Sequence, residues 1–181
     1  QKITIPSSIE YLDQFVFYEC ESITNIQIPS SLTYINHHLF GKCINLTNIV
    51  IPSSITYIGY SSFSNCESLK PIDLPSTITT IEDCAFYECI SLVSFEIPPL
   101  VTTIKRDVFS GCSSLKNIKM HSNVTSIGSS SFSKCISLVN IELPSSITSI
   151  SSSAFKGCSS LQFIQIPPLV KEIEIYTFEM C

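Results

Sequence analysis

The chain has 181 residues, of which 44% are apolar and 14% are charged, and its net charge is −5. This composition differs from those of disordered and collagen-like chains and indicates a folded protein. Because 15 acidic residues outnumber 10 basic ones without any basic run, and because no stretch approaches the roughly 20 apolar residues of a membrane span, we expect neither nucleic-acid binding nor membrane insertion.

The sequence repeats every 23 residues without slippage, and each copy carries a Phe followed three positions later by a Cys, beginning with Phe17 and Cys20. The copies start at residues 5, 28, 51, 74, 97, 120, 143 and 166, and the last one stops at its Cys. A fixed period of this length indicates a solenoid, in which each copy buries its apolar face on its neighbours. We therefore predict a single array, residues 1–181, with no linker.

The third copy illustrates the elements that we expect in each repeat. Residues 48–51 alternate outward and inward and are rich in β-branched side chains, which predicts a short parallel strand. Pro52 ends this strand, since proline lacks the N–H that a continuing strand needs. We expect a second, shorter extended piece at 56–58 and one helical or 3-10 turn at 61–66. The repeated Phe is expected to fill the core between them.

The repeated string Ile-Pro-Ser-Ser-Ile-Thr-x-Ile, followed by Phe-x-x-Cys-x-Ser-Leu-x-x-Ile, resembles the BspA-type leucine-rich repeat, also called the Treponema pallidum class, over essentially the whole sequence. The resemblance implies an α/β fold: a right-handed solenoid with a parallel β-sheet on its concave face and short helical or 3-10 turns on its convex side. It also implies surface proteins of bacteria and protozoan parasites that bind host or matrix proteins. The sixth copy departs from the pattern by carrying His121 where the other seven have Pro.

Nine cysteines are present, and eight of them are spaced 23 residues apart and fall in one column of the stack. Zinc sites need ligand pairs close in sequence, and equivalent side chains of a parallel ladder point the same way rather than toward each other. We therefore expect reduced, buried thiols that pack as small apolar groups, with metal binding, catalysis and disulfides as the alternatives. Cys84 and Cys181 fall outside this argument, and either could be exposed and oxidise between molecules. We expect no cofactor.

Candidate partner-binding residues lie in the outward positions of the predicted strands. They are mixed, weakly charged and mostly small, and they single out neither a pair of carboxylates for acid–base catalysis nor a Ser, His and acid trio, so we expect no enzymatic activity. The candidates are Asn25, Asn48, Asp73, Glu96, Lys119, Asn140 and Phe163.

A second outward column contains Tyr11, Tyr34 and Tyr57 in the first three copies. With Phe15 and Tyr60 nearby, these tyrosines could form an aromatic binding patch, because Tyr is enriched at protein interfaces. The alternative is that the tyrosines reflect only the β-propensity of an exposed ladder.

These features together predict a non-enzymatic scaffold for protein–protein interaction, and the resemblance favours a surface adhesin that binds host or matrix protein. The alternative is an intracellular leucine-rich-repeat regulator that docks on an enzyme such as a protein phosphatase. Location at the cell surface or plasma membrane is favoured only by the resemblance, with the cytoplasm as the alternative.

The two ends of the array carry apolar residues that the sequence does not cap, namely Ile3 and Ile5 at one end and Phe178, Met180 and Cys181 at the other. Solenoids need polar caps, so we expect either a fragment of a longer protein or association between copies through these ends or the sheet edges.

Overall fold

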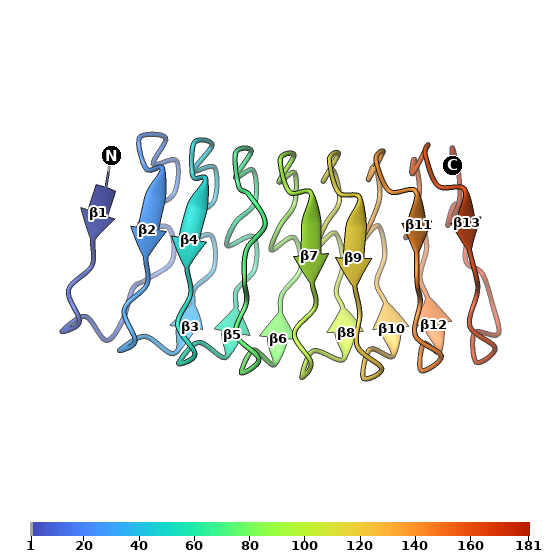
Figure 1. Cartoon of the computed structure of the whole chain (residues 1–181), viewed down its shortest axis with the longest axis horizontal. Coiled ribbons are helices and arrows are strands. Elements are labelled where there is room, and N and C mark those ends of the chain that lie inside the picture. The colour runs from blue at the N-terminus through green and yellow to red at the C-terminus, as the bar shows by residue number, and fades with distance from the viewer. Residues whose placement is uncertain (1) are drawn as a thin grey trace.

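The computed structural model describes residues 2–181, and each 23-residue copy forms one turn of a solenoid, here called a rung (Figure 1). The strands lie in two rows, with one strand of each row contributed by most rungs. The first row contains β1 (Lys2–Thr4), β2 (Asn25–Gln27), β4 (Asn48–Val50), β7 (Ser94–Glu96), β9 (Asn117–Lys119), β11 (Asn140–Ile141) and β13 (Phe163–Ile164). The second row contains β3 (Tyr34–Ile35), β5 (Tyr57–Ile58), β6 (Thr80–Ile81), β8 (Thr103–Ile104), β10 (Ser126–Ile127) and β12 (Ser149–Ile150).

Neighbouring strands within each row are parallel and pair with a register of one repeat. Asn25 of β2 lies opposite Asn48 of β4, and Tyr34 of β3 lies opposite Tyr57 of β5. Both the strand predicted near residue 48 and the shorter extended piece predicted near residue 57 are therefore confirmed, as is the period.

The first row is interrupted at residues 71–73, where the rung has no strand. Pro71 occupies the position that Asn48 holds in the preceding rung, and Asn48 donates its N–H to the carbonyl oxygen of Thr24 at 3.2 Å. Proline cannot make this bond, so the ladder stops there. The first row consists of three sheets, with the orders β1-β2-β4, β7-β9 and β11-β13.

The expected helical or 3-10 turns are not found, and residues 2–181 contain no helix of any kind. Residues 61–66 instead form hydrogen-bonded turns, in which the Cys66 N–H donates to the Phe63 carbonyl oxygen at 3.1 Å. The Phe63 N–H does not turn back on its own rung but donates to the carbonyl oxygen of Ala85 in the next one, at 2.9 Å. A left-handed residue, Asn65 with φ 58°, also prevents helix propagation. The α/β class is thus wrong for the described residues, which form a parallel β-solenoid.

The core is a continuous column of phenylalanines flanked by cysteines. Phe63 and Phe86 are completely buried, and their rings stack with centroids 5.3 Å apart and planes 6° apart. The same stacking runs from Phe17 to Phe178, with centroid separations between 5.3 and 5.8 Å. The predicted interior role of the repeated Phe is confirmed.

Residues 2–181 contain no helix, and so none that is long and apolar enough to cross a membrane.

Candidate protein-binding surfaces

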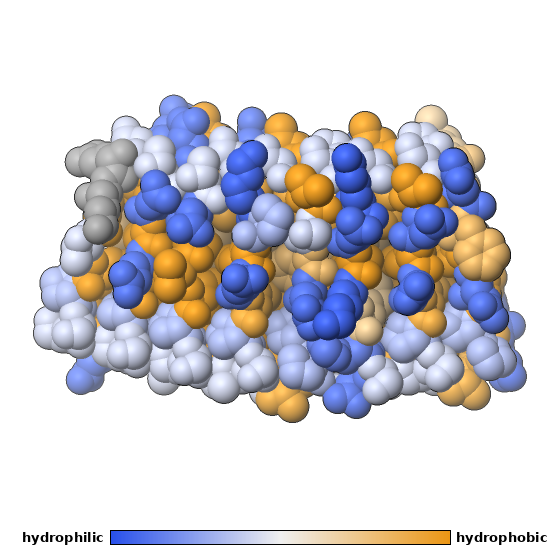
Figure 2. Space-filling model, in the orientation of Figure 1, coloured by the Kyte–Doolittle hydropathy of each residue, from blue (hydrophilic) through white to orange (hydrophobic). Residues whose placement is uncertain are grey.

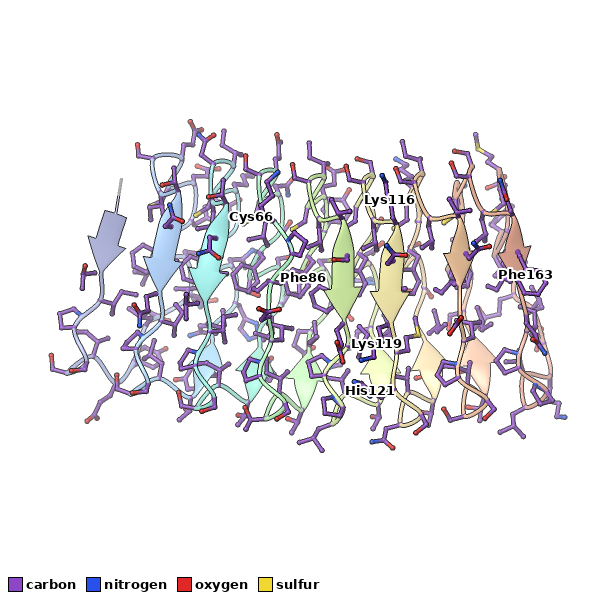
Figure 3. All side chains as sticks on the ribbon, in the orientation of Figure 1. Cys66, Phe86, Lys116, Lys119, His121 and Phe163 are labelled. Carbon is purple, nitrogen blue, oxygen red and sulfur yellow. The ribbon has the colours of Figure 1, made fainter. Side chains whose placement is uncertain are left out.

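The three-residue strands β2, β4, β7 and β9 direct their first and third side chains outward and bury the second one. In β2, Asn25 and Gln27 are exposed while Ile26 is buried. The same alternation exposes all seven candidate residues of this row, including Asp73 in the rung without a strand. Figure 2 shows this face, on which hydrophilic side chains are interspersed with hydrophobic surface, and Figure 3 shows Lys119 and Phe163 on it. Phe163 is 65% exposed.

Two charged side chains at the third strand position, Glu96 and Lys119, form an ion pair beside His121. Lys119 Nζ lies 2.8 Å from Glu96 Oε1, and His121 Nε2 lies 3.2 Å from the same oxygen. The hydrogen bond from Lys119 lowers the pKa of Glu96, which therefore stays ionised at neutral pH. Among residues 2–181, neither Asp73 nor Glu142 has a hydrogen-bond or ion-pair partner for its carboxylate.

Three hollows on this face adjoin one another through shared lining residues, and we call the three together the strand-face groove. A hollow of about 620 Å³ extends from Pro71 to His121 and shares Asn117 and Lys119 with a hollow of about 250 Å³. The smaller hollow in turn shares Asn140 and Glu142 with one of about 520 Å³ that reaches Pro168. A separate hollow of about 390 Å³ lies over β1, β2 and β4.

The strand-face groove is lined by both apolar and polar side chains. The apolar lining includes Leu74 and Leu143, which are half-buried, whereas the second residues of the strands point into the core. The polar lining includes the charged residues of the third strand position, such as Asp73 and Glu96. Protein interfaces also combine apolar and polar surface, so this groove is suited to a polypeptide partner.

The three candidate tyrosines lie on the second row, where they do not form one continuous stack. Tyr11 is 54% exposed and precedes the first strand of the row, while Tyr34 and Tyr57 are half-buried in β3 and β5. The rings of Tyr11 and Tyr34 meet edge to face with centroids 6.1 Å apart, whereas the ring of Tyr57 meets His37 at 6.2 Å.

An aromatic cluster lies on the turns that follow the second row. Phe15 and His38 stack with centroids 4.6 Å apart and planes 8° apart, Tyr18 contacts both rings, and Tyr60 packs edge-on against His38 at 5.1 Å. Burial lowers the pKa of His38. The sequence pointed to Phe15 and Tyr60 but not to His38, although its spacing of one repeat from Phe15 was the signal available.

The structure does not bring the two groups of candidate residues together. The strand-face residues belong to the first row and the tyrosines to the second, and these rows lie on different sides of the rungs (Figure 1). No described hydrogen bond, ion pair or ring contact joins a tyrosine of this set to one of the seven strand-face residues. They are two separate surfaces.

The cysteine column is buried from Cys43 to Cys158, while its end members Cys20 and Cys181 are half-buried and exposed. Burial raises the pKa of Cys112 and of Cys158 to about 12, so these thiols stay protonated. All nine cysteines are free, and the described residues include no group of three or more His, Cys, Asp or Glu side chains arranged to hold a metal ion. Cys84 is half-buried and Cys181 is exposed.

Comparison with known proteins gives one family. The model of the BspA type leucine-rich repeat region matches residues 1–113 and 79–181 in six copies. A leucine-rich cell surface protein from Faecalibacterium prausnitzii is 35% identical over 66% of this chain, with a TM-score of 0.63, and the chain spans only 31% of that protein. A Treponema pallidum leucine-rich repeat protein is 27% identical, with a TM-score of 0.65, over 76% of this chain and 77% of its own length.

A leucine-rich repeat protein from Eubacterium ventriosum has a TM-score of 0.82 over 99% of this chain and 58% of its own, at 24% identity. At that identity the likeness shows the fold alone. No curated protein matches the sequence.

Proposed function

Because the protein belongs to the BspA-type leucine-rich repeat family, we propose that it is a scaffold that binds another protein, and that it acts at the cell surface as an adhesin for a host or matrix protein. Leucine-rich repeat proteins generally bind proteins and are typically non-enzymatic. The Faecalibacterium relative, described as a cell surface protein, supports the proposed location. The right-handed winding and the concave strand face that the family resemblance implies are part of this proposal.

One observation carries the proposal, namely that the strand-face groove extends over several rungs. Its hollows adjoin one another and share Asn117 and Asn140 as lining residues, so a single extended partner can contact several rungs at once. A solenoid offers such an extended surface because neighbouring rungs repeat the same geometry. The exposed residues Asn25 and Asn48 extend the same face over β2 and β4, and the exposed ring of Phe163 adds an aromatic contact at the other end.

The test is affinity capture with matched variants. We would immobilise the protein, expose it to host-cell extract, to purified matrix proteins and to lysate of the source cell, and identify the bound proteins. Asn117→Trp places a large ring where two hollows adjoin, and Ser159→Trp places the same ring at an exposed position that lines none of the four hollows described above. Saturable capture of an identified host or matrix protein, lost in the first variant and kept in the second, is the expected result.

Two other outcomes would change the proposal. Capture of an intracellular enzyme from the source-cell lysate, with no host or matrix protein bound, would favour the regulator and remove the adhesin. Loss of capture when Tyr11, Tyr34 and Tyr57 are changed to Ser, with capture kept in the Asn117→Trp variant, would move the binding site from the groove to the tyrosines.

We also propose that copies of this protein associate through their exposed apolar side chains. Val50 is 50% exposed and Leu100 is 52% exposed, both away from the ends of the array, and exposed apolar patches mark interaction sites. Sedimentation velocity over a hundredfold concentration range should show growing species. A constant monomer mass across that range would contradict this part of the proposal.

A further inference from the structure

We infer that the strand-face groove binds an extended segment of its partner that carries two basic side chains four residues apart, one opposite Asp73 and the other opposite Glu142. This inference rests on the proposed protein-binding function and specifies the chemistry of the partner.

The first argument is the distribution of charge along the groove. The third strand position of four successive rungs carries Asp73, Glu96, Lys119 and Glu142, three carboxylates and one ammonium group. Lys119 and Glu96 neutralise each other at 2.8 Å. One carboxylate without a partner among the described residues therefore remains at each end of this four-rung stretch. A complementary ligand would place a cation at each of them.

The second argument is the spacing of these two carboxylates. Successive rungs of a parallel ladder lie about 4.8 Å apart, so Asp73 and Glu142, three rungs apart, are separated by roughly 14 Å along the array. An extended peptide rises about 3.3 to 3.4 Å per residue, and its side chains at i, i+2 and i+4 point the same way. Residues i and i+4 are then about 13 to 14 Å apart, which matches the two carboxylates.

The residue between the two cations has its own environment. The residue at i+2 lies over the centre of the span, above the paired Glu96 and Lys119. Glu96 and Lys119 already neutralise each other. A charged group at i+2 would therefore be repelled by one of them and attracted only by a charge that is already paired. We therefore expect an uncharged residue at the middle position, and the recognised pattern is Lys or Arg, three residues that include this uncharged one, then Lys or Arg.

The experiment uses two synthetic nonapeptides of identical composition, each labelled with a fluorophore and built from serine, threonine, valine and two lysines. The first has its lysines at the third and seventh positions, four apart, and the second has them at the third and sixth positions, which point to opposite sides of an extended peptide. Binding to the whole 181-residue protein is followed by fluorescence anisotropy at low ionic strength. We expect the first peptide to bind about threefold to fivefold more tightly, the gain from one additional exposed ion pair.

Three variants test which carboxylates are responsible. Asp73→Asn and Glu142→Gln should each weaken binding of the first peptide about threefold to fivefold and abolish its advantage over the second. Glu67→Gln removes the same charge from an exposed position outside the groove and should leave binding unchanged. The advantage should also shrink as salt is raised, since added ions screen exposed pairs.

Equal affinity for the two peptides, no detectable binding, or equal weakening by all three variants would overturn the inference. These results would leave the proposed function standing, because Asn117→Trp tests capture of a natural partner by blocking the groove regardless of the partner's charge. If the peptides behave as expected but no host or matrix protein is captured, the adhesin proposal fails while the charge pattern of the groove stands.

Discussion

The thiol of Cys89 donates a hydrogen bond to the backbone carbonyl oxygen of Phe63 in the preceding rung, with Sγ and O 3.2 Å apart. The same carbonyl oxygen also accepts the N–H of Cys66 in its own turn, at 3.1 Å. Equivalent thiol bonds repeat along the array, for example from Cys66 to Phe40 at 3.1 Å. This explains the repeated Phe-x-x-Cys: cysteine is apolar enough to be buried and still supplies a donor that ties each turn to the previous one.

The thiol column predicts a loss of stability at alkaline pH. Burial raises the pKa of Cys112 from its ordinary value of 9.0 to about 12, so the folded state favours the protonated thiol. This contribution is fully present below pH 9 and is lost as the pH rises from 9 toward 12, because the unfolded state releases its proton first. Each such thiol lowers the free energy of unfolding by up to about 1.4 kcal/mol per pH unit in that range.

Urea unfolding between about pH 7 and about pH 11 measures this effect. Cys112→Ala should have a lower free energy of unfolding than the parent near pH 7. Above about pH 9 its free energy of unfolding should fall less steeply with pH, because one titrating thiol has been removed. Parallel declines for the parent and the variant would show that Cys112 does not contribute.

Truncating a central ring should be costly because the cavity cannot be refilled from either neighbour. Phe86 is completely buried and stacks on Phe63 at 5.3 Å and on Phe109 at 5.8 Å. We expect Phe86→Ala to lower the free energy of unfolding by about 3 to 5 kcal/mol, measured by urea unfolding. Val93→Ala, at a position that is 38% exposed, should change it by less than about 1 kcal/mol. A similarly small change for Phe86→Ala would contradict the stacked core.

The backbones of two rungs approach each other closely at Gly59. A Cβ atom at this position would lie 2.8 Å from the carbonyl carbon of Asn36 and 2.8 Å from the amide nitrogen of His37, so the two rungs would have to move apart. Gly59→Ala should therefore cost about 1 to 3 kcal/mol and lower the Tm by about 2 to 4 °C for each kcal/mol. The control is Ser151→Ala, at the corresponding place of a later rung. Thermal unfolding that does not distinguish the two variants would show that the rungs adjust freely.

A single substitution should restore the missing ladder hydrogen bond of the first row, and another should remove an existing one. Pro71→Asn supplies an N–H for the Thr47 carbonyl oxygen, as Asn48 does for Thr24, and should stabilise the protein by about 0.5 to 1.5 kcal/mol in urea unfolding. Asn48→Pro removes the existing bond and should destabilise the protein by at least as much. Destabilisation by both substitutions would show that Pro71 does not limit the ladder.

Much of the architecture could be predicted from periodicity. The spacing of Phe40 and Cys43 and of their equivalents placed both columns in the core, and the alternation at residues 48–51 located the strand that the structure has at Asn48–Val50. Local patterns of this kind depend on which face of a short segment is buried. The prediction of a helical turn at 61–66 was wrong because alternate N–H groups of this segment donate to carbonyl oxygens of the next rung. These bonds join residues about one repeat apart, so the pattern within one segment does not reveal them.

The sequence by itself determined the period, the parallel strands, the interior columns and the exposed positions of the first row, because each follows from burial within a single repeat; Tyr34 and Tyr57, expected to be exposed, are half-buried. Only the tertiary structure decided how residues of different rungs combine: His38 between Phe15 and Tyr60, Lys119 and His121 beside Glu96, and three adjoining hollows that share lining residues. The reason is physical. Contacts and hollows between rungs depend on the sizes, charges and rotamers of residues one or more repeats apart, and no single repeat contains that information.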